Sequence, residues 1–284
     1  MPMTEIREEG PNLEWKPIVL FLVLAYGIAW ILWLPVLLGP AGLHLTKYDA
    51  SLPFFISLGT IGPLIASFLA TRYEKGRWAM PSRFLPTAQM RSWLNLVPGP
   101  ALTIVAYVIV PYVFCVAPGH KLIPLRFLAP LLAIWPNLLG GPLEEEFGWR
   151  GFLLPRLSAR IGNIWATLLV GILWASWHLP LMLTHLWGPF WYFLPMLMAA
   201  AVFASLAYWA TGGSILGPIL VHYVFNTCST MLNTAFLGQP RYRHRDINET
   251  ILVSMIGVAM LTIAATRGRF GGQSAHGAGP EIGK

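Results

Sequence analysis

Long apolar stretches alternate with short polar segments along almost the whole chain. A hydrocarbon core of roughly 30 Å is crossed by about 20 consecutive apolar residues in a helix. Each of the apolar stretches comes close to that length, so the pattern predicts an all-α, polytopic membrane protein with about eight transmembrane helices. The predicted spans are 17–38, 53–70, 94–116, 127–157, 161–183, 190–210, 214–232 and 251–266.

Composition supports a single membrane domain. Of the 284 residues, 56% are hydrophobic and only 11% are charged, which is typical of an integral membrane protein. We expect a polar N-terminal segment at 1–16, one membrane domain at 17–266 and a disordered, Gly-rich tail at 267–284. The first apolar run is too long for a signal-peptide core, so it predicts a first span rather than a cleavable signal.

The net charge of +7 does not indicate a nucleic-acid partner, because of where the cations lie. With the N-terminus inside and eight spans, most of the 19 lysines and arginines fall on the inner side. The positive-inside rule therefore predicts that both termini face inward, and a basic surface facing anionic lipid accounts for the charge. The cluster RYRHR at 241–245 is the main exception. We expect an integral protein of a bacterial or archaeal cell membrane.

Three acids stand side by side in GPLEEEFGWRG, at a depth where charge is costly. Glu146 and Arg150 are four residues apart with the acid first, the favourable order for a helical ion pair. Glu145 has no such cation, and Trp149 at i+4 gives it an apolar flank. A carboxyl buried without a cation holds a proton more readily, which suits a general base. The role of Glu144 stays open, and a purely structural ion-pair network is the alternative for all three acids.

Other polar side chains in the spans are few. His178 lies in WASWHLP, and His222 shares one helix face with Asn226 in LVHYVFNT. The midpoint between Glu145 and His178 falls at 161–162, a turn signal, so a helical hairpin there would bring the two side chains to the same depth. His222 and Asn226 both carry donors, as a developing oxyanion requires. The alternative for these residues is hydrogen bonding that only holds helices together.

Together these residues describe amide hydrolysis by a water that a Glu/His pair activates. No serine or cysteine has an evident base, so a covalent nucleophile is not indicated. The two cysteines form no CxxC, and the chain has no HExxH, so we expect no cofactor, although a zinc-dependent version stays open. A scaffold or immunity protein is the non-enzymatic alternative, and a transporter is less favoured because no repeated halves are evident.

Three ordered motifs carry a resemblance to a known family. They are EExxxR at Glu145, Glu146 and Arg150, an aromatic-xxx-His pair at Trp174 and His178, and HxxxN at His222 and Asn226. In this order, over about 125–232, they resemble the CAAX prenyl protease and bacteriocin-processing (CPBP, or Abi) family of intramembrane endopeptidases. Trp174 stands where Phe is common, and Glu144 stands where a small or uncharged residue is expected.

The resemblance implies an eight-helix fold with an active site between helices 4, 5 and 7. It implies that Glu145 and His178 activate water and that His222 and Asn226 bind the oxyanion. We expect Glu146, Arg150 and Trp174 to support these four residues. The resemblance also implies a peptide or membrane-protein substrate in the bilayer. Relatives with the eukaryotic role remove three residues after a prenylated cysteine; whether this chain acts on lipidated proteins is left open by the motifs.

Overall fold

The computed structural model of the chain describes residues 14–47, 53–85, 93–116, 134–184, 188–236 and 244–268. Nearly all of the predicted N-terminal segment and of the predicted disordered tail lies outside these residues. The first part of the fourth predicted span and most of the basic cluster at 241–245 also lie outside them. The proposed division into segments therefore stays a prediction.

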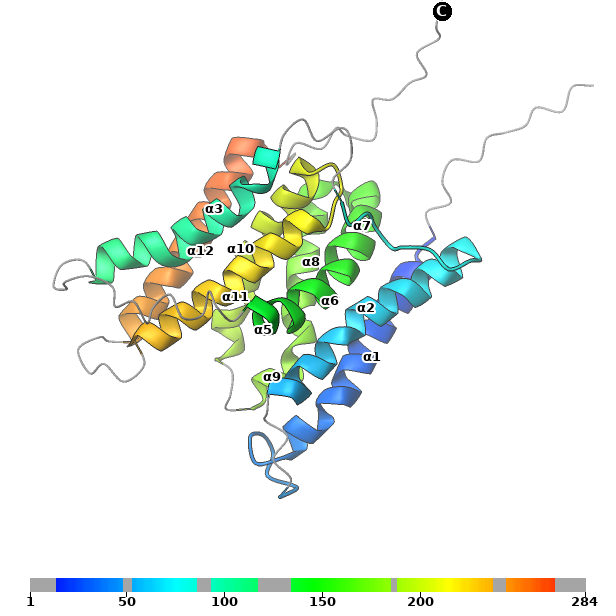
Figure 1. Cartoon of the computed structure of the whole chain (residues 1–284), viewed down its shortest axis with the longest axis horizontal. Helices are drawn as coiled ribbons and strands as arrows, with labels where there is room; N and C mark the ends of the chain where they lie inside the picture. Colours follow the sequence, from blue (N-terminus) through cyan, green and yellow to red (C-terminus); the bar gives the residue numbers. More distant parts are fainter. Residues whose placement is uncertain are drawn as a thin grey trace, which may run out of the picture.

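Regular structure in the described residues is helical, apart from one isolated bridge between Arg83 and Ser214. Figure 1 shows the helices gathered in one bundle. In chain order they are α1 (Lys16–Leu38), α2 (Pro53–Lys75), η1 (Trp93–Leu96), α3 (Pro98–Ile104), η2 (Val105–Ile109), η3 (Tyr112–Val116), α5 (Ile134–Leu139), α6 (Pro142–Glu146), η6 (Phe147–Leu153), α7 (Leu154–Ile161), α8 (Asn163–Trp177), α9 (Leu179–Met182), α10 (Phe190–Ala210), α11 (Leu216–Phe236) and α12 (His244–Thr266).

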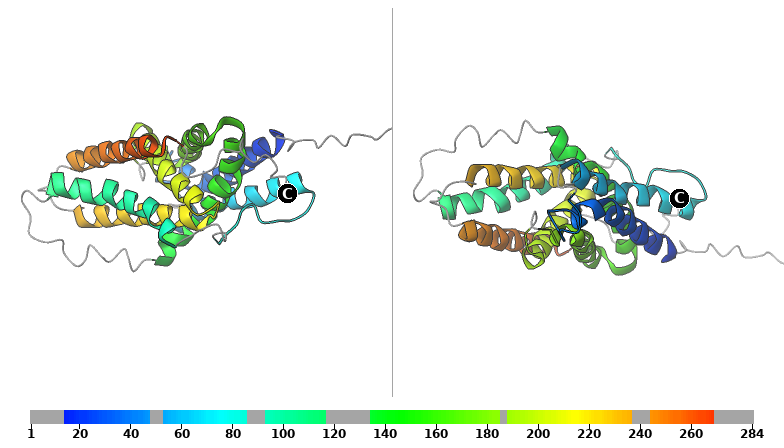
Figure 2. Two further views of the ribbon diagram at one scale, coloured as in Figure 1. Left: turned by 90° about the horizontal axis from the view of Figure 1, so that it is seen from above. Right: turned by 90° about the horizontal axis from the view of Figure 1, so that it is seen from below.

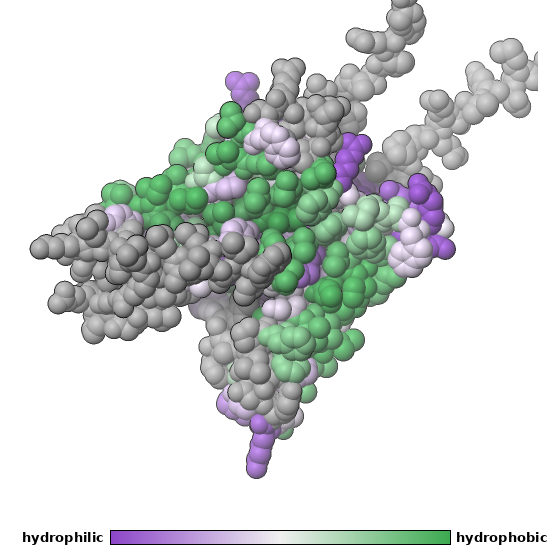
Figure 3. Space-filling view, viewed as in Figure 1, coloured by the Kyte–Doolittle hydropathy of each residue, from purple (hydrophilic) through white to green (hydrophobic). Residues whose placement is uncertain are grey.

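Five of the described helical stretches are long and apolar enough to cross a membrane: Lys16–Leu38, Phe54–Lys75, Trp93–Phe114, Phe190–Ala210 and Ile247–Thr266. The prediction of an all-α, polytopic membrane protein is therefore confirmed. In Figure 3 the described surface is mostly hydrophobic along the helices, and hydrophilic side chains gather near the ends of the bundle. The predicted number of eight spans stays a prediction, because several of the helices are shorter or interrupted.

Two of the predicted spans are interrupted at the positions that matter most for the polar motifs. Helical structure in the fourth breaks between α5 and α6, where Gly141 has φ 141°, a backbone conformation that side chains other than glycine rarely adopt. The same run continues as a π-helix, η6, through Phe147–Leu153. The fifth breaks at His178, between α8 and α9, because Pro180 cannot continue the ladder of helical hydrogen bonds.

Helix α10 lies at the centre of the bundle, packed against α8, α11 and α12, while α1 and α2 pair with each other at its side. Buried indole groups connect the two parts. The Trp177 indole of α8 donates to the Ala25 carbonyl of α1 at 3.0 Å, and the Trp33 ring of α1 packs on Trp177 with centroids 4.6 Å apart. These contacts fix α8, and therefore the residues at its end, against the α1–α2 pair.

Candidate active site

The four residues predicted to carry the chemistry line one cavity of about 550 Å³. Glu145 comes from α6, His178 from the junction of α8 and α9, and His222 and Asn226 from α11. The turn between α7 and α8 lies at Gly162, the residue predicted from the midpoint argument, with φ 80°. Three separate helical segments therefore bring the predicted residues together around one space.

Helix α6 is short and is held at its start by its own sequence. Pro142 occupies the first turn, where a missing N–H costs nothing. The Glu144 carboxylate accepts a hydrogen bond from the Gly141 N–H at 3.3 Å, the return half of a capping box. This contact gives Glu144 a structural role that the sequence interpretation left open. The signal was present, since Glu144 stands at the third helical position after a Gly-Pro helix start.

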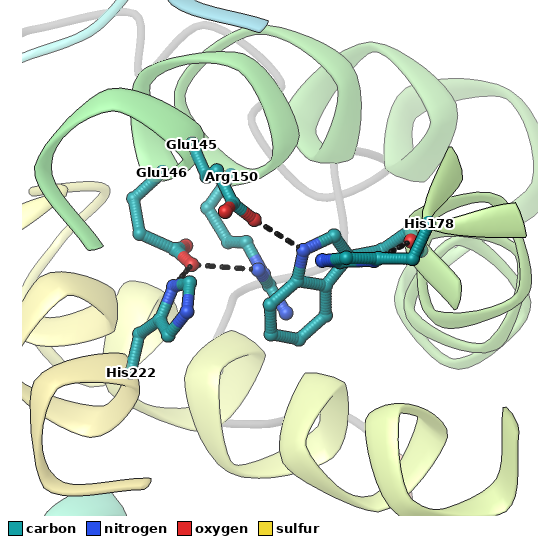
Figure 4. A network of polar contacts seen from close by, with 6 residues as sticks. Glu145, Glu146, Arg150, His178 and His222 are labelled. Carbon is teal, nitrogen blue, oxygen red and sulfur yellow. Dashed lines mark hydrogen bonds and ion pairs between the residues drawn. The ribbon is translucent and has the colours of Figure 1, made fainter. Parts of the chain in front are cut away.

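Glu145 is 3% exposed, and its carboxylate is held by a residue from α8. The Trp174 indole N–H donates to one carboxylate oxygen, Oε2, at 2.5 Å (Figure 4). The sequence interpretation expected Trp149 as an aromatic neighbour, and that contact stays a prediction. Trp149 packs on Phe21 and Trp177, with ring centroids 5.6 and 5.9 Å away. The π-helical stretch after Glu146 changes the spacing of side chains around the helix axis.

His178 owes its orientation to the break in the helix. Its backbone N–H donates to Ala175 at 3.1 Å, so it does not make the regular bond to the Trp174 carbonyl four residues back. The His178 ring makes the hydrogen bond to this carbonyl instead, with Nδ1 2.9 Å from the Trp174 oxygen. A carbonyl only accepts, so Nδ1 carries the proton, and in the neutral ring Nε2 is left with the lone pair. The ring itself lines the cavity.

Glu146 joins two helices through one oxygen. Its Oε1 accepts from Arg150 at 2.8 Å and from the Nδ1–H of His222 at 2.9 Å. Figure 4 shows the two neighbouring acids leading in different directions, with Glu146 toward His222 and Glu145 toward the indole. The Glu146–Arg150 pair was predicted from spacing, and both residues are fully buried. The bond to His222 spans distant parts of the chain, and spacing offered no signal for it.

Trp174 lies at the centre of this network. The Arg150 guanidinium carbon lies 4.3 Å from its ring centroid, within the range of a cation–π contact. The His222 ring meets the same indole edge-on at 5.0 Å. Trp174, predicted as a supporting residue and an aromatic neighbour of His178, thus contacts groups from α6, η6 and α11, in addition to the histidine one turn later.

Asn226 lies one turn after His222 and is half-buried at the cavity wall. No hydrogen bond of its side-chain amide is recorded with the described residues. Further polar wall residues were not predicted as site residues. Tyr107 is hydrogen-bonded to Ser229, and the Asn137 amide donates to Thr227 at 3.4 Å. Apart from these groups, the wall is mainly apolar and aromatic, with Trp33, Ile56, Tyr192, Phe193, Met196, Leu197 and Phe225.

A metal site is not indicated by the donor groups in the described part of the chain, where no three His, Cys, Asp or Glu residues are grouped to hold an ion. The Nδ1 atoms of His178 and His222 are both engaged in hydrogen bonds, as is one oxygen of Glu145. Independence from metal stays a prediction.

Comparison with known proteins gives a family match and a curated relative. Residues 127–228 match the model of the family described as type II CAAX prenyl endopeptidase Rce1-like. A protein named CAAX prenyl protease 2, from Methanococcus maripaludis, is 35% identical over 63 residues, which is 22% of this chain and 20% of that protein. The alignment thus spans about a fifth of that relative's own length. The family match over residues 127–228, together with this relative, confirms the resemblance to the CAAX protease family that the three motifs predict.

Proposed function

We propose that this chain is an intramembrane endopeptidase that hydrolyses a peptide bond with a water activated by Glu145 and His178. The observation that carries the proposal is the shared cavity, in which a buried carboxylate and a histidine of fixed tautomer meet a His/Asn pair from another helix. The family match over the same residues supports the reaction class.

The proposed reaction begins with water between Glu145 and His178. The Oε1 atom of Glu145 accepts a proton from the water, because Oε2 is occupied by the Trp174 N–H. The Nε2 lone pair of His178 orients the same water. The oxygen attacks the scissile carbonyl, and the tetrahedral intermediate collapses when Glu145 returns the proton to the leaving amine. The products are a carboxylate and a free amine.

The developing oxyanion is bound by the Asn226 amide and by Nε2 of His222 in this proposal. A His222 ring that donates from both nitrogens carries a positive charge. Glu146, 2.9 Å from Nδ1, supplies the opposite charge beside it and fixes the ring orientation. Arg150 in turn pairs with Glu146. Glu146 and Arg150 are therefore positioning residues, as the spacing of the motif predicts.

The substrate that fits this cavity is an uncharged segment of a peptide or membrane protein. About half of the wall is apolar or aromatic, and the rest includes amide and hydroxyl groups that can pair with a peptide backbone. The ionisable residues at the wall with a charge to offer are Glu145, His178 and His222, and the mechanism uses all three. Substrates with and without a lipid anchor both remain candidates, and we propose a cell membrane with both termini inside as the setting.

The central test compares Glu145→Gln with Glu144→Gln, a neighbouring substitution of the same shape. Purified proteins in one detergent are assayed on internally quenched apolar peptides. Loss of the general base lowers turnover by about 10²–10⁴-fold, whereas glutamine at position 144 keeps the capping contact and the activity. Equal activity of Glu145→Gln and Glu144→Gln would contradict the proposed catalytic role of Glu145 and would favour a scaffold or immunity protein.

Chelation separates the two protease mechanisms. The active protein is treated with EDTA and with 1,10-phenanthroline, and its zinc content is measured by mass spectrometry before and after. Activity that survives complete removal of metal supports the Glu/His mechanism. Activity that is lost on chelation and restored by added zinc contradicts the Glu/His mechanism and supports the zinc-dependent mechanism. Comparing the protein termini of membranes that carry active protein or Glu145→Gln identifies the substrates.

A further inference from the structure

A second cavity, of about 510 Å³, shares no lining residue with the candidate active site. It lies where the ends of α2, α7 and α10 meet the chain segment that follows α2. Its polar and charged walls come from Lys75, Ser82, Arg83, Arg156, Tyr208 and Trp209.

Specific hydrogen bonds hold the segment after α2 against the end of α10 and the start of α11. The Arg83 carbonyl accepts from the Ile215 N–H at 3.0 Å, and the Phe84 carbonyl accepts from the Ser214 hydroxyl at 2.6 Å. Ser82 shares a hydrogen bond with the Tyr208 hydroxyl. Gly151 lines the cavity below Ser82, and a Cβ at that glycine would lie 3.0 Å from the Ser82 Cβ. The cavity is therefore built by the fold.

Three cations face this cavity, and one of them is already neutralised. Arg156 forms a two-pronged ion pair with Glu74 and also donates to the Phe152 carbonyl at 2.8 Å. For Lys75 and Arg83, no ion pair is recorded with any described residue. The cavity therefore offers two positive charges that an anion could neutralise.

A buried donor adds to these charges. The indole Nε1 of Trp209 is buried from solvent and has no hydrogen-bond partner among the described residues, and Trp209 lines the cavity. An unpaired buried donor costs about 1–3 kcal/mol, and a ligand acceptor that reached this N–H would remove that cost. Phosphate oxygens accept hydrogen bonds from indole and hydroxyl groups and attract lysine and arginine.

The residues around this cavity are of the kinds that gather at the level of lipid headgroups in membrane proteins. It is formed by the ends of α2 and α10 and by the first turn of α7, and basic side chains gather around it. Arg160 of α7 reaches the Glu14 carbonyl at the start of α1 with a 2.7 Å hydrogen bond, and the end of α12 approaches α8 near Ile164. Trp and Tyr residues such as Trp209 and Tyr208 are typical of the membrane interface, and basic pockets between spanning helices suit anionic headgroups.

We propose that this second cavity binds the phosphate group of an anionic phospholipid, with Lys75 and Arg83 as its cationic ligands and the Trp209 N–H as a donor. Free phosphate shares this chemistry, and the test below separates the two sources. The site follows directly on the polar network, since Gly151 is the next residue after Arg150 in η6. This inference does not rest on the proposed peptidase activity.

Binding is measured on the purified full chain in a neutral detergent, by native mass spectrometry and by the shift in thermal unfolding. The probes are dioctanoyl-phosphatidylglycerol, dioctanoyl-phosphatidylcholine and inorganic phosphate. We expect saturable binding of phosphatidylglycerol and a higher melting temperature, with little effect of the zwitterionic lipid. Binding of inorganic phosphate with the same residue dependence would assign the site to a soluble anion that carries the same group.

Two double variants with equal change in charge test the ligands. Lys75→Gln with Arg83→Gln removes the cavity cations, and Arg72→Gln with Arg77→Gln removes two nearby cations that do not line it. We expect the first variant to weaken phosphatidylglycerol binding on the order of 30-fold, as for two cations near an anionic surface. The second should change it less than about threefold. Lys75 and Arg83 are exposed, so both variants should fold, which gel filtration and unligated melting temperatures check.

Equal losses in the two double variants would mean that only diffuse charge attraction is at work, and would overturn the site. Absence of saturable binding of both phosphatidylglycerol and phosphate to the wild-type protein would overturn it as well. Trp209→Phe supplies a charge-neutral check, because it removes the donor and keeps an aromatic ring. A several-fold loss of binding in this variant is expected, and unchanged binding would remove the indole from the proposed site.

Discussion

Glu146→Gln tests whether one carboxylate holds the polar network together. The substitution keeps the shape of the side chain and removes the negative charge between Arg150 and His222, which contact Oε1 at 2.8 and 2.9 Å. Arg150 is then a cation at 0% exposure that has lost its ion-pair partner. Removing one partner of a buried pair costs about 3–5 kcal/mol. The glutamine oxygen still accepts one hydrogen bond, so we expect about 3 kcal/mol.

The assay is thermal unfolding of the purified protein in a single detergent, followed by tryptophan fluorescence. About 3 kcal/mol corresponds to a fall in melting temperature of roughly 6–12 °C, at about 2–4 °C per kcal/mol. A second variant adds Arg150→Met to Glu146→Gln and so removes the uncompensated cation. Because the two residues are in direct contact, their effects should be non-additive by about 1–3 kcal/mol.

A Glu146→Gln variant that melts within about 1 °C of the wild type would show that the Glu146 charge does not hold the network together. The same conclusion would follow if the double variant lost as much stability as the two single variants together, since that would mean that Glu146 and Arg150 act independently. Glu144→Gln is the matched control, because it removes a neighbouring charge of the same shape that is only half-buried.

Three further substitutions probe the parts of the site that the backbone sets. Gly141→Ala places a side chain at φ 141° and a Cβ 2.9 Å from the Glu145 carboxylate, so it should cost about 1–3 kcal/mol in thermal unfolding and most of the turnover; near-wild-type activity would contradict this. Glu144→Ala should lose about 0.5–2 kcal/mol through the cap while Glu144→Gln keeps it, and equal melting temperatures would argue against the cap. Pro180→Ala lets the helix continue past His178 and frees its ring from the Trp174 carbonyl, so turnover should fall while the melting temperature holds or rises; full activity in a peptide assay would show that the break is not needed.

The parts of the fold that follow from local chemistry could be predicted from the sequence. Hydropathy defined Phe190–Ala210 with the bounds that the structure has, because an apolar helix in lipid ends where polar and turn residues begin. The turn at Gly162 followed from its glycine. The Glu146–Arg150 pair followed from its spacing, and the break at His178 had a readable cause in Pro180.

The parts that depend on contacts between distant residues could not be predicted in the same way. The spacing of residues within a motif says nothing about which helix will face it, so the His222–Glu146 and Trp174–Glu145 bonds had no signal in periodicity. The π-helix at Phe147–Leu153 also lacked a signal in the sequence pattern. The docking of the segment around Arg83 on Ser214 likewise joins two loops that sequence patterns treat as unrelated.

Movement of the five-residue helix α6 would affect Glu145 and Glu146 at the same time. These two adjacent acids are tied to different neighbours, Glu145 to Trp174 of α8 and Glu146 to His222 of α11. A small rotation of α6 would therefore loosen both ties in one movement, and both halves of the proposed reaction would stop together. Binding of a substrate on one side of α6, or of a lipid beyond Gly151 on the other, would therefore switch the whole site on or off if it moved this short helix.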